Sequence, residues 1–178
     1  ECTALYDRYR ATLLFVPPVR AFDPNPEQRW LFVFPHPDDE VAVGAWIRRL
    51  IDAGNPVWLC WMHAPTRRRS ESERVCDELL HVPKERRIFL GAEDGRMVES
   101  MPRLRNLIQA ALLESSPDRV ATVAFEQGHL DHDTVNHLVN STFDGPVIEW
   151  PMYHPYTRRI QTLNAFAISD GEEVLPLS

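Results

Sequence analysis

Two short segments of the sequence combine histidine and carboxylate side chains in a pattern that suits metal chemistry. The first segment reads Pro35-His36-Pro37-Asp38-Asp39-Glu40, and the second reads Glu126-Gln127-Gly128-His129-Leu130-Asp131-His132. Imidazole nitrogens and carboxylate oxygens are ordinary zinc ligands, and a catalytic zinc site uses three protein ligands and leaves a position open for water. Together the two segments have the composition of a catalytic divalent-metal site.

The spacing within the segments suggests which side chains are ligands. His36 and Asp39 are three residues apart, and a turn that runs into a helix can aim both at one point. We expect His132 to be the third ligand. Asp38 must point elsewhere, because consecutive residues of a tight turn diverge, and a carboxylate beside the metal is placed to act as general base on a water. A bound metal lowers the pKa of that water toward ~7, which makes the proton transfer feasible.

The second segment also supplies a candidate acid. His129, when protonated, would stabilise an oxyanion and protonate a leaving amine, and Asp131 would hold that imidazolium in orientation. A purely structural explanation exists for the first segment alone, since proline fixes a turn and Asp39 can cap the following helix. Capping does not require three imidazoles in one crevice, so the two segments together favour a hydrolytic metal site.

The rest of the chain alternates between strand-like and helix-like patterns. Apolar runs predict strands at 30–34, 57–62, 87–90, 120–125 and 147–150, with a peripheral strand at 165–168. Helical periodicity predicts helices at 40–53, 70–80, around 104–112, and at 133–141. This alternation is typical of an α/β fold, a Rossmann-like doubly wound, mostly parallel sheet with helices on both faces. We expect one domain over 30–178, preceded by an N-terminal arm, 1–29, with a short helix.

This fold class explains how distant segments meet. In the strand order 3-2-1-4-5, strands one and four are neighbours, and the loops after them leave toward opposite faces of the sheet. Ligands bind in the crevice between such loops. The first histidine segment follows strand one and the second follows strand four, so we expect both to line that crevice.

Composition excludes several other classes of protein. The net charge of −7 argues against non-specific nucleic-acid binding, which needs a basic surface. No apolar run approaches the ~18 residues of a membrane span, and no signal segment is recognisable at the start. The three cysteines form no C-x-x-C pair, which suits a reducing compartment. We therefore expect a cytoplasmic protein with no membrane span and no nucleic-acid partner.

The two segments resemble the motifs of the LmbE-like (PIG-L type) zinc-dependent de-N-acetylases. Leu90-Gly91 and Asp94-Gly95 are also similar to a Leu-Gly…Asp-Gly stretch that follows the third strand in that family. The resemblance covers roughly 30–138, and the first segment is its most specific part. It implies that zinc is bound by His36, Asp39 and His132. It also implies that Asp38 is the general base and that His129 assists through charge or proton donation.

The sequence departs from the family pattern mainly where substrate would bind. Pro35 stands where Ala is usual, Leu130 stands where Pro is usual, and Gln127 stands where some members carry a Tyr. The stretch 63–69 lacks the usual Gly-rich segment. The candidate substrate-binding residues are Arg68, Arg69, Gln127 and Tyr153.

The residues and the resemblance together predict a zinc-dependent hydrolase that removes an N-acetyl (N-acyl) group from an amino sugar. The partner would be an N-acetylglucosamine-like sugar or sugar conjugate, and a homo-oligomer is left open. Fe²⁺ or another divalent metal is an alternative to Zn²⁺, because iron sites also use two histidines and one carboxylate. Two other functions stay open, namely a non-catalytic metal- and sugar-binding module and a 2-His-1-carboxylate iron enzyme.

Overall fold

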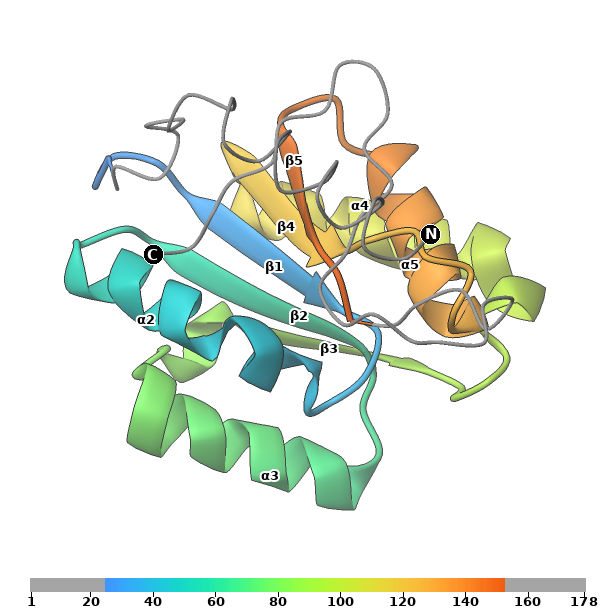
Figure 1. The fold of residues 1–178 in the computed structure, drawn as a ribbon, viewed down its shortest axis with the longest axis horizontal. Helices are drawn as coiled ribbons and strands as arrows, with labels where there is room; N and C mark the ends of the chain where they lie inside the picture. Colours follow the sequence, from blue (N-terminus) through green and yellow to red (C-terminus); the bar gives the residue numbers. More distant parts are fainter. Residues whose placement is uncertain (1–24, 153–178) are drawn as a thin grey trace, which may run out of the picture. The chain divides into compact units, whose positions relative to one another are not determined.

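A five-stranded sheet forms the centre of the protein (Figure 1). The computed structural model describes residues 25–152, which lie within one compact unit. The strands are β1 (Trp30–Phe34), β2 (Val57–His63), β3 (Arg87–Ala92), β4 (Arg119–Val123) and β5 (Val147–Trp150). Their order is β3-β2-β1-β4-β5, and every neighbouring pair is parallel. The doubly wound α/β fold predicted from the sequence is confirmed.

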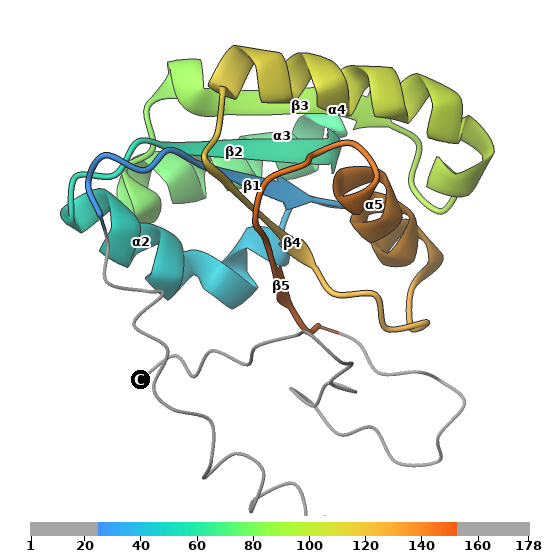
Figure 2. The ribbon, with the colours of Figure 1, turned by 90° about the horizontal axis from the view of Figure 1, so that it is seen from above.

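Helices cover both faces of this sheet (Figures 1 and 2). One face carries α2 (Gly44–Asp52), which follows the 3₁₀ turn η2 (Asp39–Val43), and α3 (Thr66–Val75), which continues into the π-helical turn η3 (Cys76–Leu80). The other face carries α4 (Met101–Ser115) and α5 (Leu130–Asn140). The short 3₁₀ turns η4 (Lys84–Arg86) and η5 (Met97–Ser100) flank β3. No helix within residues 25–152 has the length and apolar character needed to cross a bilayer.

The central strand β1 is buried along its whole length, because successive side chains point to opposite covered faces. Phe32 packs edge-on against Trp46 of α2, with ring centroids 4.9 Å apart. On the opposite face, Leu31 and Val33 join a cluster contributed largely by α4 and α5, including Leu104, Ile108, Val135 and Leu138. The carboxyl end of β1 is therefore held from both sides, and it provides a firm platform for the residues that follow it.

Three helical regions differ from the sequence-based expectation. α3 begins at Thr66 and α5 at Leu130, several residues before the predicted starts at 70 and 133. Their first turns carry polar side chains, so the apolar period used to find helices does not extend into them. The region 40–53 is not one α-helix, because a 3₁₀ turn precedes Gly44. The expected short helix of the arm, the strand at 165–168, and Tyr153 lie outside the described residues.

Candidate metal centre

The two histidine segments meet at the carboxyl edge of the sheet, as the strand order predicts. β1 and β4 are hydrogen-bonded neighbours, His36 follows β1, and His129 and His132 lie at the start of α5. The ring centroids of His36 and His132 are 5.4 Å apart, and those of His36 and His129 are 5.2 Å apart. The fold thus gathers three imidazoles from two distant parts of the chain into one cluster, at the edge of the sheet where this fold class forms its ligand-binding crevice.

Three buried side chains form a donor set of the kind that binds divalent metals. Asp39 Oδ2 lies 3.6 Å from His36 Nδ1 and 3.6 Å from His132 Nε2. One ligand atom from each residue lies within 4.8 Å of the others. Two ligands of a tetrahedral zinc ion, each bound at the usual distance, are separated by about 3.4 Å. Both the chemistry of the donors and their spacing therefore fit a divalent cation.

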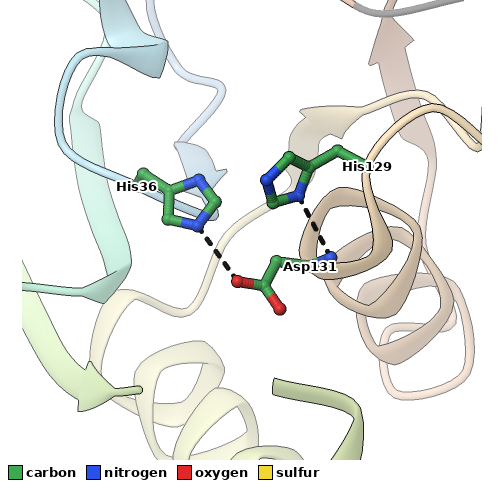
Figure 3. Close-up of side chains that lie close together, drawn as sticks. All are labelled: His36, His129 and Asp131. Atoms are coloured by element: carbon green, nitrogen blue, oxygen red, sulfur yellow. Dashed lines mark hydrogen bonds and ion pairs between the residues drawn. The ribbon is translucent and has the colours of Figure 1, made fainter. Parts of the chain in front are cut away.

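Asp131 sets the orientation of His36. Its carboxylate, which is fully buried, lies 3.1 Å from His36 Nε2 (Figure 3). It also accepts hydrogen bonds from the backbone N–H groups of Gly95 (2.6 Å) and Met97 (3.1 Å). When Nε2 carries the proton in this contact, Nδ1 of His36 presents its lone pair toward Asp39. Metal-binding histidines commonly donate their second ring N–H to a carboxylate in this way.

His129 belongs to a second group of donors, together with His36 and Asp131 (Figure 3). The Asp131 carboxylate already accepts two backbone N–H groups and contacts His36, so this second group is the poorer metal site. His129 Nδ1 accepts a hydrogen bond from the backbone N–H of Asp131 at 3.2 Å, which caps α5. With Nδ1 as acceptor, a neutral His129 carries its proton on Nε2. Asp131 thus reaches His129 through its backbone, and its carboxylate bonds to His36.

Asp38 lies at the rim of the crevice, in surroundings opposite to those of Asp39. The Asp38 side chain is 70 % exposed, whereas that of Asp39 is 3 % exposed. Arg68 of α3 donates to the Asp38 carboxylate at 2.7 Å and to the Pro37 carbonyl at 2.7 Å. Asp38 has a φ of 99°, in the left-handed region that residues other than glycine rarely adopt. This backbone conformation separates the two neighbouring carboxylates.

The predicted substrate-binding residues have different surroundings. Arg68 lies in the crevice beside Asp38. Arg69 pairs with Glu73 at 3.0 Å, and its guanidinium lies 4.3 Å from the centre of the Phe89 ring. Gln127 is exposed on the loop that leads to α5, where its backbone N–H donates to Asp133. Of the described candidates, Arg68 is therefore the one that donates hydrogen bonds to the first histidine segment.

Two polar residues on the β3 side of the cluster were not among the predicted site residues, although the place of His63 at the end of a predicted strand allowed it to reach the rim. Asp94 Oδ1 lies 3.2 Å from His36 Nε2, and Asp94 Oδ2 lies 3.9 Å from Arg68. His63 Nδ1 contacts the Ala92 carbonyl at 2.8 Å, and its Nε2 lies 4.0 Å from Asp94. The Leu-Gly…Asp-Gly stretch contained Asp94, but nothing in the spacing of these residues predicts that the loop after β3 folds over His36.

The two histidines of the donor set, His36 and His132, differ in how strongly they hold a proton. Burial, reinforced by the neighbouring imidazoles, lowers the pKa of His132 to about 4, so this ring is neutral at pH 7. Burial also acts to lower the pKa of His36, but hydrogen bonds and charges from Asp39, Asp131 and Asp94 outweigh it and raise that pKa. A metal requires neutral imidazole, so metal binding competes with protons mainly at His36.

Comparisons with known proteins find relatives of this chain by sequence. The family model described as GlcNAc-PI de-N-acetylase (PIG-L) matches residues 31–143. A Bacillus cereus protein named probable N-acetyl-alpha-D-glucosaminyl L-malate deacetylase 2 is 31% identical over 147 residues, which cover 72% of this chain and 67% of that protein.

Solved structures with the same fold include two named as deacetylases. N,N'-diacetylchitobiose deacetylase from Pyrococcus horikoshii matches with a TM-score of 0.56 and 24% identity, over 75% of this chain and 57% of that chain. The A40926 pseudoaglycone deacetylase Dbv21 matches with a TM-score of 0.60 and 22% identity, over 81% of this chain and 70% of that chain. The chain thus spans less than two thirds of the diacetylchitobiose deacetylase.

Proposed function

Because the chain belongs to the family described as GlcNAc-PI de-N-acetylase (PIG-L), we propose that it is a metal-dependent amide hydrolase that removes an acetyl group from an N-acetylated amino sugar or sugar conjugate. The names of its relatives support this substrate class. The observation that carries the proposal is the buried donor set of His36, Asp39 and His132, with the exposed carboxylate of Asp38 next to it in the chain.

We assign the metal to those three residues, with zinc as the first candidate and ferrous iron as the alternative. Zinc accepts two imidazoles and one carboxylate and leaves a coordination position open. Ferrous iron uses the same ligand types, so the donor set alone does not separate the two metals. When bound, such a cation supplies Lewis acidity, which acidifies water and polarises an amide carbonyl.

Two residues beside the donor set, Asp38 and His129, have separate roles in the reaction. Asp38 takes a proton from the water that adds to the amide carbonyl, while Arg68 holds the Asp38 carboxylate in place. His129 donates from Nε2 to the carbonyl oxygen as negative charge develops there. As the C–N bond breaks, the departing amine takes up the proton that Asp38 removed from water, while His129 keeps its Nε2 proton and its hydrogen bond to the oxyanion. The products are acetate and the free amino sugar, so the proton lost by water ends on the amine.

Polar groups on the α3 and β3 sides of the crevice suit the hydroxyls of a sugar. Arg68 offers N–H donors, the half-exposed Asp94 offers carboxylate oxygens, and His63 offers a ring nitrogen. We assign substrate binding first to these residues. Gln127 and Tyr153 stay candidates, and Arg69 is the weakest candidate because Glu73 and Phe89 already engage its guanidinium.

Two substitutions test the proposed chemistry by separating metal binding from proton transfer. Asp38→Asn should lower acetate release from N-acetylglucosamine conjugates by about 100-fold or more, which is the usual contribution of a general base, while metal content is retained. His132→Ala should abolish both acetate release and stoichiometric metal binding. Acetate release is measured by a coupled assay and metal content by elemental analysis. Near-normal acetate release by either variant would overturn the proposal.

A further inference from the structure

Glu40 takes no part in the proposed metal and proton chemistry, yet it is among the most deeply buried charged residues of the described chain. Glu40 is 1 % exposed. Glu40 Oε2 accepts hydrogen bonds from the backbone N–H of Asp38 at 2.8 Å and from the indole N–H of Trp61 at 3.0 Å. Glu40 Oε1 accepts from the Ser72 hydroxyl at 2.6 Å. The carboxylate thus links the first segment to β2 and to α3.

The backbone of Asp38 needs such support. A φ of 99° is strained for aspartate, and strained conformations persist only where the surroundings hold them. The peptide between Pro37 and Asp38 is held at both ends, because its carbonyl accepts from Arg68 and its N–H donates to Glu40. Trp61 lies in the sheet and is fully buried, so the Glu40 carboxylate is itself fixed in the core.

We propose that Glu40 is a positioning residue for the general base. Its carboxylate holds the Asp38 peptide in the left-handed conformation, which turns the Asp39 side chain inward to the metal and the Asp38 side chain outward to the substrate. The inference rests on the proposed function, in which Asp38 accepts the proton of water. What matters in this proposal is one acceptor oxygen at the position of Glu40 Oε2, which the N–H groups of Asp38 and Trp61 both need. The charge of the side chain does not matter.

The need for an acceptor oxygen predicts which substitutions of Glu40 preserve the backbone conformation of Asp38. In Glu40→Gln, the amide oxygen can accept from Asp38 and Trp61, while the amide N–H donates to Ser72, whose hydroxyl is also an acceptor. Glu40→Ala removes the acceptor. Ser72→Ala is the matched control, because it removes a partner of the same carboxylate from the opposite oxygen and leaves the Asp38 contact in place.

The test measures kcat and KM for acetate release, together with metal content and melting temperature. Glu40→Ala should lower kcat by about 100-fold, as expected for a misplaced catalytic group, with KM changed by less than about threefold and metal retained. Glu40→Gln should recover most of that loss, and Ser72→Ala should lower kcat by less than about threefold. A merely structural role would lower melting temperature in Ser72→Ala and Glu40→Ala without this difference in kcat.

Three kinetic results would overturn the inference: a kcat of Glu40→Ala within threefold of the unmodified protein, an equal loss in Glu40→Gln, or an equal loss in Ser72→Ala. If Glu40→Ala does not fold, Glu40→Met fills the same space without an acceptor and takes its place. If the unmodified protein releases no acetate from any conjugate, the proposed function fails. Crystal structures then decide about Glu40, since a positive φ at Asp38 that survives in the variant without the acceptor overturns the inference.

Discussion

Asp38 and Asp39 are adjacent in the chain and have opposite environments. Asp39 lies buried between two imidazoles, and Asp38 is exposed beside Arg68. The sequence predicted the divergence of the two side chains, because consecutive residues of a tight turn point apart. The hydrogen bonds that enforce it were not predictable, since Glu40, Trp61 and Arg68 come from three parts of the chain that only the fold brings together.

Asp131 provides a prediction at the same scale. Asp131→Asn replaces one acceptor oxygen by an N–H₂ group, which must face either the His36 ring or the N–H groups of Gly95 and Met97. His36 then loses its fixed orientation, and metal affinity should fall about 10- to 100-fold. Competition with a chromophoric chelator measures that affinity.

A neighbouring aspartate serves as the control for this change. Asp133 lies on the same helix and accepts the backbone N–H groups of Glu126 and Gln127. Both N–H groups donate to one oxygen, Oδ1, so Asp133→Asn keeps an acceptor for them and should leave metal affinity close to that of the unmodified protein. Equal losses of affinity in the two variants would show that Asp131 acts through the stability of α5 and not through His36.

At the scale of elements, the sequence predicted the five described strands well, because strands of a covered parallel sheet leave continuous apolar runs, and the fold class predicted their order. It placed the starts of α3 and α5 too late. The early turns of these helices carry Arg68 and His132, polar residues that face the crevice and so break the apolar period. The parts of the helices that were hardest to predict are therefore those that carry candidate functional residues.

At the amino ends of β1 and β4, away from the candidate metal centre, a contact between Asp118 and Arg29 offers a test of fold stability. The Asp118 carboxylate accepts from the backbone N–H of Arg29 at 2.8 Å, next to the paired starts of β1 and β4. This backbone hydrogen bond, with the Arg29 guanidinium, lowers the pKa of Asp118 below its usual value of 3.8. Because the folded pKa is the lower one, the contact stabilises the protein above pH 3.8, and the stabilisation is lost as pH falls through the folded pKa.

Asp118→Asn should accordingly lower the melting temperature at pH 7 by about 2 °C, since the contact is partly exposed. The difference from the unmodified protein should shrink as the pH is lowered below the usual pKa of an aspartate. Scanning calorimetry across this pH range measures it, and Asp144→Asn, at an exposed carboxylate, is the control. A difference that persists unchanged at low pH would exclude the ionised Asp118 as its cause.

At the scale of the whole molecule, the family to which the chain belongs and the geometry of the candidate metal centre support each other. The chain covers 57% of the diacetylchitobiose deacetylase and 67% of the Bacillus cereus relative. The family motifs lie in the two loops after β1 and β4, and these are the loops that converge in the structure. The sequence could predict this candidate centre because its donors lie in two short motifs. On the α3 side it predicted Arg68, but it did not predict that Asp94, in the loop after β3, lies against His36.

The most direct test of metal-dependent deacetylation is acetate release by one protein preparation before and after metal removal. The protein is stripped with a chelator and then titrated with Zn²⁺ or, without oxygen, with Fe²⁺, on a panel of N-acetylglucosamine conjugates. We predict no acetate release from the stripped protein and full recovery at one equivalent of metal. Acetate release by the stripped protein, or its absence from every conjugate while one equivalent of metal is bound, would contradict the assignment.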